Sequence, residues 1–140
     1  MPSTGLPVTG LLHEETQVHD SGIDLTVTEI HEIDDPGRVD FGGGELEPPG
    51  VLPHERHWRN PDDDYQWWRL EAGQYLMEYN ESLDTDDAVT IQPRPALLER
   101  GASHPTLRTA ALASMPISVG GSGILIKENA RVSTVITRQS

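Results

Sequence analysis

The sequence predicts an all-β domain. Residues 23–33 alternate apolar and polar side chains almost without fault, which is the pattern of a half-buried strand with its odd positions toward the core. Other apolar runs are short and are separated by turn signals such as Asp-Pro-Gly at 35–37 and Gly-Gly-Ser-Gly at 120–123. Many short strands joined by tight turns are typical of a sandwich or barrel.

The remaining elements follow from local patterns. Residues 65–79 predict two strands around a turn at Ala72-Gly73, and residues 95–101 predict one short helical turn closed by Gly101. Residues 106–119 are weakly patterned. Further strands are expected at 39–41, 88–92, 124–126 and 132–137.

Length and composition indicate one domain over residues 1–140. Residues 1–17 are expected to form an irregular lead-in, and residues 42–64 an acidic loop rich in Pro and Gly. Without cysteine there is no disulfide, thiol nucleophile or cysteine zinc site. Because the sequence has no long apolar run and its first residues lack the features of a secretion signal, we expect no membrane contact and a cytoplasmic protein.

The charge is strongly negative. The chain has 23 acidic and 10 basic residues, a net −13, and Lys127 is its sole lysine. Acidic surfaces poor in lysine stay hydrated in concentrated salt, where screening weakens their self-repulsion. The composition favours a salt-adapted, halophilic host, with an acidic partner-binding surface as the alternative, and it argues against binding of duplex nucleic acid.

The charge is also uneven along the chain. Residues 1–102 carry 22 acids and 6 bases, a net −16, whereas residues 103–140 carry 1 acid and 4 bases, a net +3. One interpretation is that the last third packs against the rest of the chain or against another subunit. The other is that its basic side chains meet an anionic ligand.

Two groups of residues are candidates for a metal-binding or phosphate-binding site. Asp24 begins the expected strand beside Gly22, where a carboxylate can hold Mg²⁺ directly or through water, or can simply lie exposed. Arg94 and Arg100 flank a Pro-containing turn, where they can clamp phosphate oxygens or pair with the abundant carboxylates. Residues 54–57, His-Glu-Arg-His, do not have the spacing of a helical zinc site, and no serine has a nucleophile setting.

Four segments in order resemble the dUTPase/dCTP deaminase superfamily, especially its archaeal members. Residues 21–25 are Ser-Gly-Ile-Asp-Leu and residues 70–76 are Leu-Glu-Ala-Gly-Gln-Tyr-Leu. Residues 94–101, Arg-Pro-Ala-Leu-Leu-Glu-Arg-Gly, are similar to the family's Arg-Ser-Ser-Leu-x-Arg-x-Gly motif, and residues 129–136 are similar to a late strand. The resemblance covers about residues 18–137.

The resemblance implies a distorted jelly roll that assembles as a homotrimer with sites between subunits. It implies a dUTP diphosphatase-like reaction, in which a deoxynucleoside triphosphate and water give the monophosphate and pyrophosphate, with Mg²⁺ as cofactor. By the same resemblance, Asp24 would help to hold the metal. The phosphate-binding residues would be Arg94, Arg100, Gly101 and Arg131.

The chain departs from the family pattern at several positions. The paired serines that contact phosphates are Pro95 and Ala96 here, and the late-strand Gln is Thr134. Residues 106–119, where the family has its water-activating acid and sugar platform, contain no carboxylate. The catalytic residue is therefore unknown from the sequence.

Two functions stay open. In the first, the activating carboxylate comes from the acidic segments 60–64 or 84–87, or from a neighbouring subunit. In the second, the chain is an inactive homologue that binds nucleotide or only assembles. dCTP deamination is expected less than hydrolysis, because the deaminases of the family also need an acid in the 106–119 segment.

The uneven charge yields a testable prediction about salt. Like-charge repulsion over residues 1–102 should destabilise the fold at low ionic strength. We expect the melting temperature to rise steeply between dilute buffer and molar salt, as followed by circular dichroism. A flat or falling dependence would contradict salt adaptation.

Overall fold

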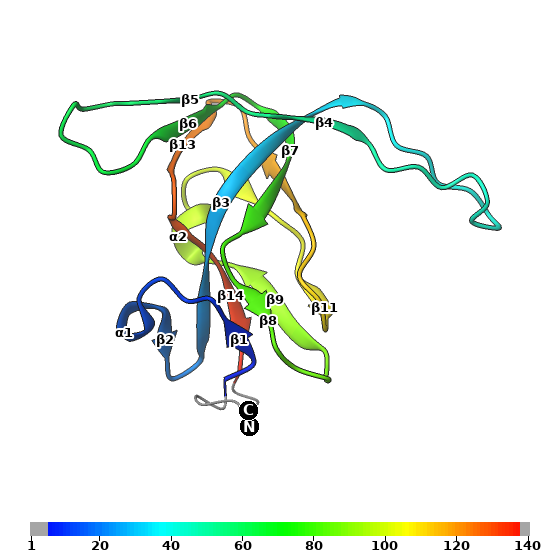
Figure 1. Ribbon diagram of the computed structural model, residues 1–140. Helices are drawn as coiled ribbons and strands as arrows, with labels where there is room; N and C mark the ends of the chain where they lie inside the picture. Colours follow the sequence, from blue (N-terminus) through cyan, green and yellow to red (C-terminus); the bar gives the residue numbers. More distant parts are fainter. Residues whose placement is uncertain (1–5, 138–140) are drawn as a thin grey trace.

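The computed structural model describes residues 6–137 and consists mainly of β-strands, as predicted (Figure 1). Within these residues the helices are two four-residue segments, α1 (Glu14–Gln17) and α2 (Pro95–Leu98). No helix of the described part is long and apolar enough to cross a membrane. The strands are β1 (Val8–Thr9), β2 (Val18–His19), β3 (Gly22–Asp35), β4 (Gly50–Pro53), β5 (Arg56–His57), β6 (Trp67–Leu70), β7 (Gly73–Tyr79), β8 (Ser82–Leu83), β9 (Val89–Pro93), β10 (Ala102–Ser103), β11 (Leu107–Thr109), β12 (Met115–Val119), β13 (Ile124–Lys127) and β14 (Arg131–Ile136).

The long strand β3 organises the antiparallel sheets. The largest sheet has the order β10-β12-β7-β3-β14-β9-β11, with β2 and β4 also paired to β3. The first half of β3 pairs with β14 and its second half with β7 and β4. Two smaller sheets, β13-β6-β5 and β1-β8, complete the described fold. The last strand, β14, thus lies between β3 and β9, which agrees with the interpretation that the end of the chain packs against the rest.

The core departs from strict alternation along β3. Ile23, Leu25 and Val27 are fully buried, as predicted, but Asp24 and Thr26 between them are also buried, so this half of β3 is not the half-buried strand that was expected. The register against β7 then shifts between Val27 and Glu29, so that the next buried side chain is Ile30, an even position. An inserted residue in one strand reverses which face the following side chains occupy.

Three expectations for the loops were wrong. The expected lead-in 1–17 contains β1 and α1 within residues 6–17, while residues 1–5 lie outside the described residues. The expected loop 42–64 contains β4 and β5, because residues 50–53 complete the ladder of β3 and Arg56 and His57 pair with β6. Residues 39–41 form no strand and lie in a hairpin arm instead.

Two turns predicted from glycine and aromatic patterns are confirmed. Gly101 closes α2 with a φ of +95°, a conformation that glycine adopts without strain. The turn before Gly73 separates β6 from β7. Of the adjacent tryptophans on β6, Trp68 is fully buried and Trp67 faces outward, with Arg59 over its ring.

A buried chain of hydrogen bonds links β7, β14 and the segment after β10. His104 Nδ1 lies 2.8 Å from the Pro105 carbonyl, which only accepts, so this nitrogen carries the proton. His104 Nε2 then accepts from Ser133 Oγ at 2.7 Å, and Tyr79 donates to Ser133 Oγ at 2.6 Å. Burial lowers the pKa of His104, which keeps the ring neutral and the direction of the chain fixed.

This chain predicts a pH-dependent stability. In the unfolded chain His104 is protonated near pH 6.5, whereas in the folded chain its pKa is lower. The free energy of unfolding should therefore fall as pH drops through 6.5. His104→Gln should remove this component and cost about 1–3 kcal/mol at pH 8. The wild-type advantage should shrink between pH 8 and pH 5 in denaturant unfolding. Parallel curves for the two proteins would contradict the assignment, because the other histidines are common to both.

Candidate active site around Asp24

Asp24 lies near the start of β3, opposite Thr134 of β14. Its side chain is 2% exposed, so it is a buried carboxylate rather than the exposed strand residue that the sequence left open. Gly22, two residues earlier, permits this approach, because a Cβ there would lie 2.4 Å from the Val135 carbonyl oxygen.

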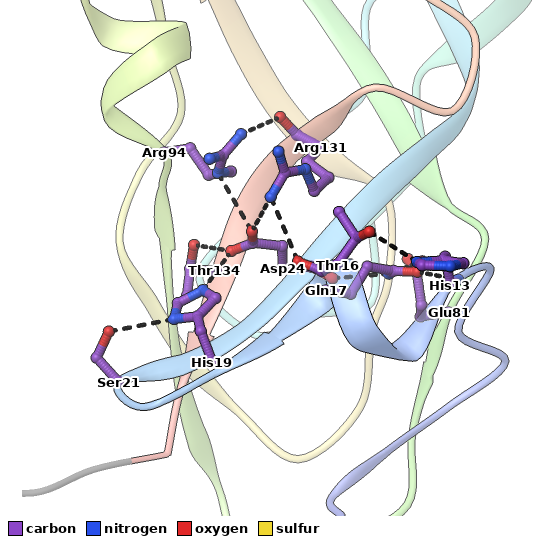
Figure 2. Close-up of polar contacts among 10 residues, drawn as sticks. All are labelled: His13, Thr16, Gln17, His19, Ser21, Asp24, Glu81, Arg94, Arg131 and Thr134. Carbon is purple, nitrogen blue, oxygen red and sulfur yellow. Dashed lines mark hydrogen bonds and ion pairs between the residues drawn. The ribbon is translucent and has the colours of Figure 1, made fainter.

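Both carboxylate oxygens of Asp24 are fully engaged (Figure 2). Oδ1 accepts from Thr134 Oγ1 at 2.8 Å and from His19 Nε2 at 3.0 Å. Oδ2 lies 3.0 Å from Arg131 Nη1 and 3.5 Å from Arg94 Nε. Burial alone would raise the pKa of Asp24, but the hydrogen bonds from His19 and Thr134 and the charge of Arg94 hold this pKa below its usual value.

The two arginines reach Asp24 from different elements. Arg94 is the residue before α2, and Arg131 is the first residue of β14. Arg94 Nη1 also donates to the Arg131 carbonyl at 3.3 Å, and Arg131 Nη1 to the Thr16 carbonyl at 3.4 Å. The arginine side chains are 24% and 37% exposed, respectively, so both can meet solvent.

The cluster is therefore suited to bind an anion. Two guanidinium groups share one carboxylate, which leaves a local excess of one positive charge in a chain of net charge −13. A guanidinium has five N–H donors, and within the described residues the Nη2 groups of Arg94 and Arg131 have no hydrogen-bond partner. Paired arginines with outward donors are suited to phosphate or carboxylate oxygens.

A second set of buried hydrogen bonds, made by Gln17 and Glu81, holds the backbone of Asp24 and Thr26 in place. Gln17 Nε2 donates to the Asp24 carbonyl at 2.9 Å and to Glu81 Oε2 at 2.8 Å. Glu81 accepts from the Thr26 amide at 2.8 Å and from the Thr26 hydroxyl at 2.6 Å. Sequence reasoning missed Gln17 and Glu81. The one available signal for Glu81 was that residues 79–81, Tyr-Asn-Glu, continue the family-like segment 70–76.

Arg100 and Gly101 are not joined to this cluster. Arg100 follows the far end of α2, where its Nη1 donates to the Ala96 carbonyl at 3.0 Å and lies 3.6 Å from Glu99. Its side chain is 65% exposed. The phosphate-binding roles of Arg100 and Gly101 stay predictions, and the described contacts join only Arg94 and Arg131 to Asp24.

The residues present do not fit a directly bound Mg²⁺. Oδ1 of Asp24 accepts two hydrogen bonds, and Oδ2 accepts one from Arg131 and lies 3.5 Å from Arg94 Nε, so two guanidinium groups already neutralise the charge that a metal ion would need. Within residues 6–137 there is no group of three His, Cys, Asp or Glu side chains that could hold a metal ion. The metal-binding role of Asp24 stays a prediction that this geometry does not favour.

The segment that lacks the expected carboxylate lines a cavity of about 460 Å³. One wall consists of residues 110–114, between β11 and β12. The acidic residues of the opposite wall are Glu78 and Glu81, rather than the acids of the 60–64 or 84–87 segments. Glu81 is engaged with Thr26 and Gln17, whereas the Glu78 side chain is 48% exposed and lies 3.7 Å from His31.

Two roles of Asp24, orienting the arginines or binding a metal ion, predict different effects of Asp24→Asn on ligand binding. Asp24→Asn should weaken the binding of pyrophosphate about tenfold or more, because the amide no longer orients the guanidinium groups. Binding of Mg²⁺ alone should not change. Isothermal titration calorimetry with each probe measures both, and lost Mg²⁺ binding with intact pyrophosphate binding would show that Asp24 is a metal ligand.

The same variant should change the acid stability. A lowered pKa stabilises the fold above the unfolded value of 3.8, and that contribution is lost as pH falls through the folded pKa. The free energy of unfolding of the wild type should therefore exceed that of Asp24→Asn by about 1–3 kcal/mol at neutral pH. The difference is small because both arginines are partly hydrated. The difference should vanish in strong acid.

Comparisons with known proteins agree with this fold and these motifs. No family model matches the chain. A probable deoxyuridine 5'-triphosphate nucleotidohydrolase of Methanosarcina acetivorans is 33% identical over 132 residues, which cover 87% of this chain and 72% of that protein. The protein of the same description from Methanosarcina mazei is 31% identical over the same shares.

A solved structure shares the fold. The 2'-deoxycytidine 5'-triphosphate deaminase of Agrobacterium tumefaciens has a TM-score of 0.59 at 14% identity, over 92% of this chain and 42% of that one. At this identity the likeness concerns the fold, and it confirms the predicted distorted jelly roll. Together with the archaeal relatives, it shows that the chain belongs to the dUTPase/dCTP deaminase superfamily.

Proposed function

We propose that the chain hydrolyses dUTP to dUMP and pyrophosphate. The archaeal relatives, which are named as probable enzymes of this reaction, support the substrate. The proposal depends on the pair of partly exposed arginines that contact Asp24. Guanidinium groups bind phosphate oxygens, and the triphosphate is the anionic part of dUTP. The deoxynucleoside triphosphate is the partner molecule in this proposal.

The arginines have a defined part in the chemistry. The oxygen of a water molecule bonds to the α-phosphorus and gives a proton to a carboxylate base, while the bond from that phosphorus to the bridging oxygen of the β-phosphate breaks. Pyrophosphate leaves with the electron pair. Arg94 and Arg131 would donate to phosphate oxygens and stabilise the charge that grows on this leaving group. Asp24 would hold both guanidinium groups in position without contacting the substrate.

A second candidate is a homologue that binds nucleotide without turnover. The absence of any carboxylate in residues 106–119 favours it. Glu78 is the more exposed of the two carboxylates that line this cavity, so it joins the acidic segments 60–64 and 84–87 and a neighbouring subunit as a candidate source of water activation. dCTP deamination stays the less favoured reaction.

We also propose that the protein works in the cytoplasm as a homotrimer. The proposal about assembly follows from the superfamily to which the chain belongs. The fully exposed Phe41 and the largely exposed Val39 are consistent with surfaces that another copy covers.

A panel of nucleotides separates the candidate functions. Wild-type protein in molar salt with Mg²⁺ is mixed with dUTP, dCTP, dTTP and UTP, and both pyrophosphate and ammonia are measured. Pyrophosphate from dUTP supports the proposed hydrolase, and ammonia from dCTP identifies a deaminase. Binding without either product would indicate the inactive homologue, and no binding of any nucleotide would overturn both candidates.

Arg94→Ala tests the anion site itself. An arginine–phosphate contact contributes about 1.5–3 kcal/mol, so affinity for a non-hydrolysable imido analogue of dUTP should fall roughly tenfold or more. Arg69→Ala, at an exposed arginine of β6, is the matched control and should bind as the wild type does. If Arg94 only pairs with the buried Asp24, its loss should leave nucleotide binding unchanged and lower the free energy of unfolding by about 1–3 kcal/mol, because a buried carboxylate loses one of its cations.

A further inference from the structure

Glu81 is a buried carboxylate that forms no ion pair within residues 6–137. It is 3% exposed, and its hydrogen bonds come from the Thr26 amide and hydroxyl and from Gln17 Nε2. Each of these partners is a donor, so both oxygens of Glu81 act only as acceptors. Apolar groups of the same shape often replace such a buried polar cluster at little cost in stability, so stability alone does not account for a carboxylate here.

The first path from Glu81 leads through Gln17 to the arginine site (Figure 2). Gln17 Oε1 accepts from two backbone amides just before α1, so its Nε2 faces the other way and donates both to Glu81 and to the Asp24 carbonyl. The residue before Gln17 is Thr16, whose carbonyl oxygen accepts from Arg131 Nη1 at 3.4 Å. The bond between Glu81 and Gln17 therefore orders the backbone of Asp24 and a carbonyl that contacts Arg131.

The second path leads through Thr26 to the turn before β14. Thr26 Oγ1 donates to Glu81 and accepts from Asn80 Nδ2 at 2.9 Å. The same nitrogen of Asn80 donates to Asn129 Oδ1 at 2.8 Å. Asn129 has a φ of +67°, a left-handed conformation that no other described residue except glycine adopts. Arg131 follows two residues later as the first residue of β14, so the turn at Asn129 sets where its backbone begins.

We propose that Glu81 positions Asp24 and Arg131 for phosphate binding without contacting the phosphate. The two paths reach Arg131 from different sides: the Thr16 carbonyl contacts its guanidinium group, and the turn at Asn129 leads into its backbone. The inference rests on the proposed binding of a triphosphate at the arginines. Glu81 thus acts on the site only through its neighbours, and it takes no part in the chemistry itself.

Glu81→Gln keeps the shape of the side chain but supplies an N–H group where only acceptors fit. Whichever way the new amide is turned, this group faces either the Thr26 amide or Gln17 Nε2, which are both donors. The affinity for pyrophosphate, measured by calorimetry in molar salt, should therefore fall about tenfold. The circular dichroism spectrum should stay that of the wild type.

A matched pair of variants at Asn129 tests the second path at a partly buried turn. Glycine adopts a φ of +67° without strain, so Asn129→Gly permits the turn but removes the bond to Asn80. Asn129→Asp keeps an acceptor for Asn80 Nδ2 and tolerates the same backbone conformation. Affinity for pyrophosphate should fall severalfold in Asn129→Gly and be kept in Asn129→Asp, because molar salt screens the added charge.

The side-chain Nε–Hε signal of Arg131 in NMR spectra reports on positioning without any ligand. The signal is assigned by its loss in Arg131→Lys. In the wild type it should lie away from the position of a freely rotating arginine, and it should move toward that position in Glu81→Gln and in Asn129→Gly. His104→Gln breaks a different buried network, so this matched control should lower stability but leave both the signal and the affinity unchanged.

An unchanged Arg131 signal with wild-type affinity in both Glu81→Gln and Asn129→Gly would overturn the proposed role, while the proposed function would stand. An equal loss of affinity in His104→Gln would also overturn it, because binding would then follow overall stability. If Glu81→Gln does not fold, the Asn129 pair decides, and equal affinities of its two variants contradict the role. A wild type that does not bind pyrophosphate contradicts the proposed function alone, because the Arg131 signal still tests the positioning.

Discussion

The buried carboxylate of Asp24 is the constraint on which the site depends. A carboxylate with 2% of its side chain exposed stays charged only if donors replace its water. Three donors and one further cation surround it, and they come from four places in the chain: the last residue of β2, the residue before α2, and two positions on β14. All four side chains contact the same carboxylate of Asp24. The positions of Arg94 and Arg131 therefore depend on the packing of β3 against β14.

The layer beneath Asp24 extends this constraint to the N-terminal residues. Gln17 donates to the backbone of Asp24 and to Glu81, and its Oε1 accepts from the Leu12 and His13 amides, each at 2.8 Å. A fully buried amide that uses both its oxygen and its nitrogen fixes the segment around it. The first turn of helix is therefore ordered by long-range hydrogen bonds rather than by helix propensity, which is low for four residues.

This explains which features were readable from the sequence. Alternation fixed the existence of β3, and glycine identified the end of α2, because both signals are local. The role of Asp24 was not readable, since its partner Arg131 lies 107 residues away. The bulge after Val27 was likewise invisible, because register depends on the facing strand.

The segment 42–64 shows the same limit. Residues 42–64 have the Pro, Gly and acid content of a loop, and composition alone assigned them to one. Pairing of β4 with β3 and of β5 with β6 gives much of this segment regular backbone contacts. Local composition measures how a segment behaves alone, whereas an antiparallel partner supplies hydrogen bonds that composition does not record.

The departures from the family pattern have a common physical consequence. At the positions of the paired serines, Pro95 has no amide hydrogen and Ala96 has no hydroxyl, so this turn offers fewer neutral donors to a phosphate. Under the proposed function, recognition of the triphosphate would then depend more on the guanidinium groups of Arg94 and Arg131. Exposed charges lose strength in concentrated salt, but an arginine held by a buried carboxylate keeps its orientation when its field is screened. In a chain of this acidity, Asp24 thus preserves the geometry of the two arginines to which we assign phosphate binding.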